Sequence, residues 1–202
     1  MAGTMSLADL RADLKDSLHD AASVLGDPND FDRCLMVAVE HLSFMLPRTL
    51  AATLTLAAEV AEYPAPADYL RFKMAMWGRA TTVQPWDKAH PGRLPDCLYF
   101  EGALVLLPAP TAQQIGLLGN SYRYFYFAKY TLDELAANTT VPATLRAALL
   151  LRAQAECCKE LAIRNVAKPV TMRDGGGGQP RNGTPGHLYN VLLAEFMARV
   201  SA

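Results

Sequence analysis

The sequence lacks the features that mark several large classes of protein. It has 19 lysines and arginines against 20 aspartates and glutamates, so its formal net charge is -1 and no basic excess is available to grip nucleic-acid phosphates. No uninterrupted apolar run approaches the roughly 20 residues that a membrane-spanning helix requires. Residues 1–6 show neither a basic region nor an apolar stretch, and we therefore expect no secretion signal. The composition, 51% hydrophobic and 19% charged, is that of an ordinary globular protein.

Cysteine and histidine occur in no metal-binding or disulfide pattern. The four cysteines are irregularly spaced and include the adjacent pair Cys157 and Cys158, and adjacent cysteines rarely bridge each other. We expect them to be small buried residues in a reducing compartment. The four histidines form no His-x-x-x-His pair, and the chain has no Cys-x-x-Cys motif. The sequence therefore predicts no metal ion and no cofactor.

No common catalytic motif is present either. The four glycines at 175–178 have neither a strand before them nor a helix directly after them, as a phosphate-binding loop requires. We predict that the protein is not an enzyme. One alternative stays open, because residues distant in the sequence can converge in a fold: an active site around Glu101, Tyr122 and His90.

Two amphipathic helices are predicted at the start of the chain. Ser6 is a suitable N-cap, and apolar residues follow it at the three- and four-residue spacing of one helical face. The turn at 26–29 ends this helix, and Asp30 is predicted to cap the next one, which ends before Pro47. Two helices joined by such a short turn form an antiparallel pair.

The pattern changes to that of β-strands after Pro47. Residues 50–56 mix β-branched and apolar side chains, and residues 69–76 alternate between apolar and polar or small ones. This alternation predicts a strand with one buried face.

The stretch 97–130 is the strongest β signal in the chain and predicts two to four further strands. Its last strand, which begins at Tyr122, carries aromatic residues on both faces, and we expect it to be covered on both. Before this stretch, the loop 78–95 holds Trp86 and His90. A loop of this length is expected to be exposed and to serve a specific purpose.

Helix returns over 141–166, where many alanines allow close packing against other helices. The tail after this helix is different in kind. Its part at 169–186 is rich in glycine and proline and predicts a flexible tether, whereas 187–200 has the spacing of a short amphipathic helix. We expect this last helix to dock on a partner. The alternative is that it folds back on the helices of its own chain.

These patterns together predict an α+β fold, in which an antiparallel helical bundle carries an inserted small antiparallel β domain and an extended C-terminal tail with a short helix. The expected divisions are an N-terminal helical pair (1–48), the inserted β domain (49–132), a long returning helix that completes the bundle (133–168), and the tether with its docking helix (169–202).

The order of these elements resembles the head–tail adaptor (connector) proteins of tailed bacteriophages. The resemblance rests on the extended region 54–77 with Tyr63-Pro64-Ala65-Pro66-Ala67-Asp68-Tyr69, which looks like the family's strand, tyrosine-proline turn and following strand. It rests also on Leu104-Val105-Leu106-Leu107-Pro108-Ala109-Pro110-Thr111, which is similar to an apolar strand closed by Pro-x-Pro, and on the alanine-rich helix with Cys157.

The resemblance implies a homo-oligomeric ring, expected to be a dodecamer, at the neck of a virion that is assembled in the host cytoplasm. The helices would form the ring wall, and the β insertion would face neighbouring subunits or the next neck or tail component. The ring would join that component to the portal protein, and DNA would pass through the lumen without specific binding.

The resemblance also implies that the C-terminal segment inserts against the portal, and a second interface is expected in the exposed loop at Trp86 and His90. The expected portal anchors are Leu188, Tyr189, Leu192, Phe196 and Met197. An alternative function is a non-viral peptide- or protein-binding module without catalysis, in which the Trp86 loop or the aromatic strand grips a partner.

Overall fold

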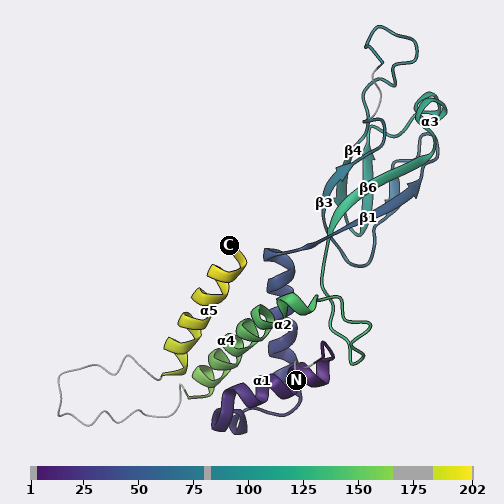
Figure 1. Cartoon of the computed structure of the whole chain (residues 1–202). Helices are drawn as coiled ribbons and strands as arrows, with labels where there is room; N and C mark the ends of the chain where they lie inside the picture. The colour runs from purple at the N-terminus through teal and green to yellow at the C-terminus, as the bar shows by residue number, and fades with distance from the viewer. Residues whose placement is uncertain (1–3, 80–82, 166–183, 202) are drawn as a thin grey trace, which may run out of the picture. The chain divides into compact units, whose positions relative to one another are not determined.

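The computed structural model of the protein describes residues 4–79, 83–165 and 184–201 (Figure 1). The chain divides into two compact units: a helical unit, Met1–Leu46 with Tyr130–Ala202, and a β unit, Pro47–Lys129. The β unit is therefore inserted into the sequence of the helical unit. Helices and two small antiparallel sheets confirm the predicted α+β class. Among the described helices, none is long and apolar enough to cross a membrane.

The helical unit begins with α1 (Leu7–Leu18), a 3-10 helix (His19–Val24) and α2 (Asn29–Met45). Ser6 is the N-cap of α1, as predicted, and its hydroxyl accepts a hydrogen bond from the backbone N–H of Asp9 at 3.2 Å. The prediction that Asp30 caps α2 is wrong, because the helix begins at Asn29, two residues before the start that an Asp30 cap would give, and Pro28 is at the N-cap position. The carboxylate of Asp30 instead accepts a hydrogen bond from the backbone N–H of Gly26 at 2.6 Å, which anchors the preceding turn to the first turn of α2.

The unit continues with a short 3-10 helix (Ala143–Leu145), α4 (Arg146–Asn165) and α5 (Pro185–Ser201). One apolar core joins the four α-helices of this unit, and α5 lies along α4 (Figure 1). Most of the predicted tether, residues 169–183, lies outside the described residues. The buried apolar side chains of this core include Leu10, Leu14, Phe31, Leu35, Leu42, Leu149 and Phe196.

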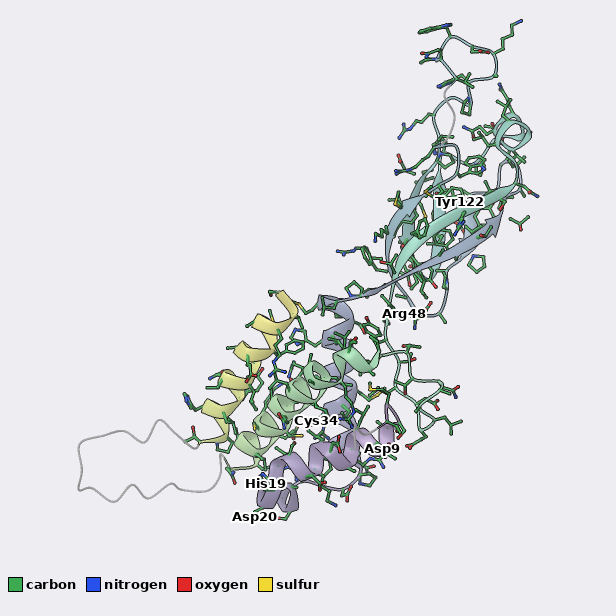
Figure 2. All side chains as sticks on the ribbon, in the orientation of Figure 1. Asp9, His19, Asp20, Cys34, Arg48 and Tyr122 are labelled. Atoms are coloured by element: carbon green, nitrogen blue, oxygen red, sulfur yellow. The ribbon has the colours of Figure 1, made fainter. Side chains whose placement is uncertain are left out.

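Cysteines occupy the contact between α2 and α4. Cys34 on α2 (Figure 2) and Cys157 and Cys158 on α4 are all buried and free. The neighbouring Cys34 side chain and burial both raise the pKa of the Cys157 thiol. The expectation that Cys157 and Cys158 are small packing residues is confirmed.

The β unit contains two three-stranded antiparallel sheets. In the first sheet, β6 (Ser121–Ala128) lies between β1 (Arg48–Thr55) and β3 (Tyr69–Ala75). In the second, β5 (Ala103–Leu107) lies between β2 (Glu62–Pro64) and β4 (Asp96–Phe100). Alternate residues of both sheets point into one shared core, so their outward faces point away from each other. The core includes Tyr63, Tyr69, Leu104, Leu106, Tyr122, Tyr124 and Tyr126.

A short helix, α3 (Ala112–Leu118), follows β5 and was missed by the sequence analysis. Its start is a capping box: the Thr111 hydroxyl accepts from the backbone N–H of Gln114, and the Gln114 side chain accepts from the backbone N–H of Thr111. The side-chain amide of Gln114 also donates to the carbonyls of Pro91 and Arg93, at 3.0 and 2.8 Å. The helix start therefore fixes the end of the loop that carries Trp86.

The expectation that both faces of β6 are covered is wrong. Tyr122, Tyr124 and Tyr126 are buried in the core, but Phe125 and Phe127 on the opposite face are only half-buried. Cationic side chains from the same sheet, rather than another layer of structure, lie over these two rings.

Candidate functional site

Glu101, Tyr122 and His90, the residues of the possible enzyme site, form no hydrogen-bonded group in the described structure. Glu101 is exposed in the turn between β4 and β5, where it and Gly102 have φ values of 46° and 84°. Tyr122 is 1% exposed in the β-unit core (Figure 2), and burial raises the pKa of its hydroxyl. His90 is in the loop and accepts a hydrogen bond through Nδ1 from the backbone N–H of Gly92. Within the described ranges, no hydrogen bond links any two of these three side chains.

A small cavity of about 200 Å³ lies beside Tyr122 and is lined also by Trp77, Arg79 and Leu94. Its volume is below the roughly 300 Å³ at which ligand pockets of ordinary size begin. The Tyr122 hydroxyl has no hydrogen-bond partner among the described atoms. In the described part of the chain, no group of three or more His, Cys, Asp or Glu residues is placed to bind a metal ion. Large apolar side chains that are exposed on both units supply candidate interaction surfaces.

The first candidate surface is α5, which has apolar side chains on two sides. On the side that faces the unit's own core, Phe196 is fully buried and its ring centroid is 5.3 Å from that of His41 on α2. Leu188 and Val191 are each 46% exposed on one flank of the helix, and Met197 is 37% exposed on the opposite flank, because nine residues separate Leu188 from Met197 by half a turn. Polar side chains, Asn190, Glu195 and Arg199, are exposed along the same helix, so the exposed apolar residues of α5 are separate contact points rather than one apolar side.

The expected portal anchors are thus divided between the two sides of α5. Leu188 and Met197 are exposed, Leu192 packs in part against the core, and Tyr189 is half-buried. Phe196 belongs to the core of the helical unit, which agrees with the alternative that α5 folds back on its own chain. Val191 was not among the expected anchors, although its three-residue spacing from Leu188 places it on the same side.

A buried polar network lies beneath α5 and was not found from the sequence. Arg152 on α4 donates from Nε to Nδ1 of His41 at 2.7 Å and from Nη2 to Oε1 of Glu156 at 2.5 Å. Burial, followed by the positive charge of Arg152, lowers the pKa of His41, so the imidazole is neutral and can accept this hydrogen bond. Burial alone would raise the pKa of Glu156, but its bond to Arg152 and the charge of Lys159 outweigh this effect and lower it.

The second candidate surface is the loop around Trp86. The indole is 83% exposed, which is unusual for so large an apolar side chain. Backbone hydrogen bonds from Asp87 to Gln84 and from His90 to Asp87 form consecutive turns beside it. Trp86 is therefore presented on a structured turn, whereas His90 is half-buried and bonded within the loop.

The third candidate surface consists of the outward faces of the two β sheets. The first sheet presents Arg71, Lys73 and Arg123 around the rings of Phe125 and Phe127, and we call these five residues the basic face. The second sheet presents large exposed apolar side chains next to carboxylates, and we call this set the apolar face. Its members are Leu98, Phe100, Val105, Leu107, Glu62 and Asp96.

The structure is similar to a chain in "Neck of native GTA particle computed with C12 symmetry", with 15% identity over 90% of this chain and 86% of that chain and a TM-score of 0.29. It is similar to the same extent to a chain in "Neck of empty GTA particle computed with C6 symmetry", with 14% identity, the same coverage and a TM-score of 0.29. No curated protein sequence matches the chain.

The sequence model of the SU10 adaptor protein family matches residues 5–169, which include the described parts of α1 to α4 and the whole β unit. This match confirms the resemblance to phage adaptor proteins that the sequence itself indicates. The chain belongs to the SU10 adaptor protein family.

Proposed function

We propose that this protein is a structural, non-enzymatic adaptor in the neck of a tailed phage or phage-like particle. In this role it forms a homo-oligomeric ring, a dodecamer, that joins the portal to the next neck or tail component and lets DNA pass through its lumen. The observation that carries the proposal is the family match over residues 5–169. The large apolar side chains left exposed on both units support it, because such surfaces mark sites of protein–protein contact.

The exposed surface of α5 is the proposed portal-docking surface, with Leu188 and Val191 on one flank of the helix and Met197 on the other. Leu188, Val191 and Met197 supply apolar contact, while Phe196 and Leu192 keep the helix on its own unit. Docking from this position is favoured over release of the helix, because release would expose Phe196 and cost about 1.5–3 kcal/mol for that side chain alone. A modest contact of this kind becomes strong when a ring repeats it around a symmetric partner.

The proposed lumen lets DNA pass and does not bind it tightly. A chain with a net charge of -1 offers little general attraction to a polyanion, so the duplex can slide past the ring without being held. The particle neck is the proposed location, and assembly takes place in the host cytoplasm.

Negative-stain microscopy of the purified protein, alone and mixed with the portal protein of the same phage, tests the ring and its docking. We expect closed rings or portals that carry a ring at one end. The double variant Leu188→Ser, Met197→Ser should keep the fold and lose portal attachment, whereas Asn190→Ser, at an exposed position of the same helix, should attach normally. A monomer that never joins a portal refutes the adaptor function. Normal attachment of the double variant refutes only the docking surface.

A second function is favoured by one observation, the 83% exposure of Trp86. A non-enzymatic peptide- or protein-binding module would use this indole as the anchor in a partner's pocket. It would form a complex of fixed stoichiometry without a closed ring, and Trp86→Ala would abolish the complex. Rings formed by the Trp86→Ala variant, with unchanged portal attachment, would instead support the adaptor.

A further inference from the structure

The two outward faces of the β unit differ in charge. On β1, β3 and β6, the outward positions carry cations, aromatic rings, threonines, small residues and Met74, which pairs with Phe125. None of these outward positions, all of which are described, carries a carboxylate. Asp68, which precedes β3, accepts a hydrogen bond from the hydroxyl of the core residue Tyr126.

The cations of the basic face are held against its aromatic rings. The guanidinium of Arg71 and the ammonium of Lys73 lie 4.8 and 5.1 Å from the ring centroid of Phe127, and the guanidinium of Arg123 lies 5.7 Å from that of Phe125. Lys73 also donates to the hydroxyl of Thr49 on β1 at 3.2 Å. These contacts fix the positions of the cationic side chains, and the aromatic rings do not neutralise their charge. The basic face can therefore bind carboxylates of a partner.

The apolar face has the complementary character. Leu98 pairs with Val105 across the β4–β5 ladder, and Phe100 pairs with Ala103, which makes a continuous apolar strip. Leu98, Phe100 and Leu107 are 53%, 64% and 47% exposed. Contiguous exposed apolar side chains of this kind mark interaction sites, of which protein–protein contacts are one class.

Two carboxylates flank this strip. Glu62 lies on the same face, opposite Val105, and has no ion-pair partner in the described part of the chain. Asp96 forms a 3.3 Å pair with Arg93, but both side chains are at least 75% exposed, and a pair exposed to that degree contributes little. Both carboxylates therefore remain available to a cationic partner.

We propose that the basic face of one copy binds the apolar face of the next copy, so that the β units make head-to-tail contacts around the adaptor ring. This inference rests on the proposed ring. The two faces lie on opposite sides of one shared core, as a head-to-tail contact requires. Arg71 and Arg123 meet Glu62 and Asp96, and the rings of Phe125 and Phe127 meet the apolar strip.

A symmetric contact of like faces is disfavoured. Two basic faces brought together would oppose three cations to three cations, and like charges placed together at an interface cost several kcal/mol. Two apolar faces brought together would oppose Glu62 and Asp96 to themselves. In the head-to-tail contact, the cations of one face meet the carboxylates of the other. When the rotation from each copy to the next adds up to a full turn, this contact produces a closed ring and not a dimer.

A charge-exchange experiment tests the contact. The first variant, Arg71→Glu with Arg123→Glu, makes acidic the two positions of the basic face that are proposed to meet Glu62 and Asp96, and changes the charge of that face from +3 to -1. The second, Glu62→Lys with Asp96→Lys, makes the flanks of the apolar strip basic. Each variant alone opposes like charges at every contact, and we expect the concentration at which rings form to rise on the order of 100-fold or more.

An equimolar mixture of the two variants should form rings again, because alternating copies restore opposite charges at every contact. Sedimentation velocity and negative-stain microscopy measure assembly, and circular dichroism checks the fold of each variant. Arg71→Lys with Arg123→Lys keeps the basic face positive at the same two positions, and Lys88→Glu reverses a charge in the exposed loop. Both controls should assemble as the wild type does.

The outcomes separate this inference from the proposed function. A wild-type chain that forms no ring, alone or with the portal, overturns both. Wild-type rings that persist in either variant, or a mixture that fails to assemble, overturn only the contact between these two faces. Normal rings together with a loss of duplex-DNA binding in the first variant would assign the basic face to DNA and also overturn the contact.

Discussion

The replacement Phe196→Ala should loosen α5 without unfolding the rest of the helical unit. Phe196 has no exposed surface, and its ring packs against His41 and the apolar core that α4 and α5 share. Truncating a buried phenylalanine costs about 3–5 kcal/mol, from lost apolar contact and from the cavity left behind. If the whole loss falls on the docking of α5, even 3 kcal/mol shifts the balance between docked and undocked helix by on the order of a hundredfold.

Hydrogen exchange of the amides of α5 measures this shift directly. We expect faster exchange in α5 and little change in α2. Leu188→Ala is the matched control, because Leu188 is on the same helix but 46% exposed, and its replacement should change stability by no more than about 0.5 kcal/mol. Wild-type exchange in the Phe196→Ala variant, or an equal acceleration in the control, would refute the assignment of Phe196 to the core and of Leu188 to the outer side.

Two further predictions concern pH and backbone conformation. Because burial and Arg152 lower the pKa of His41 below its ordinary value of 6.5, folding favours the neutral imidazole. Its contribution to stability is complete above pH 6.5 and declines as the pH falls through 6.5 toward the lowered pKa. The midpoint of thermal unfolding should therefore drop between pH 7 and pH 5, and less so in His41→Gln; an equal drop in both proteins would contradict this assignment. Gly102→Ala should lower the free energy of unfolding in urea by about 1 kcal/mol, because Gly102 has a φ of 84° and open space around it. Gly116→Ala, in the helical backbone of α3 with equal space, should raise it by about 0.5–1 kcal/mol, and the reverse order would contradict the turn conformation.

Periodicity was sufficient to predict the α+β class and most of its helices and strands. The cap at Ser6 and the strand beginning at Tyr69 have local causes, namely a hydroxyl before an apolar stripe and alternation along the chain. The helix α3 has a local cause as well, the Thr111-x-x-Gln114 pattern, but the prolines just before it were interpreted as the end of a strand and the start of a turn.

Pairing between distant segments could not be predicted from local pattern. β5 is the strand that precedes β6 in the sequence, but β6 pairs with β1 and β3 instead. The tyrosines of β6 pack against β5 in the core between the two sheets. The same limit applies to the candidate surfaces. The exposed position of Trp86 followed from its loop, but the grouping of Arg71, Lys73 and Arg123 on one face depends on how β3 and β6 pair.

The insertion of the β unit gives the chain a modular architecture. Arg48 and Ala128 are the first register pair of β1 and β6, so the two ends of the β unit lie about 5 Å apart at Cα. In the helical unit, the backbone N–H of Tyr130 donates to the hydroxyl of Ser43 on α2 at 2.9 Å, so the returning chain is fastened beside the helix that it left. A segment with adjacent ends can be exchanged, lengthened or removed by a single recombination event while the helical core remains intact. Evolution can therefore give the β unit a new neighbour-binding surface without altering the residues that fold the helical unit.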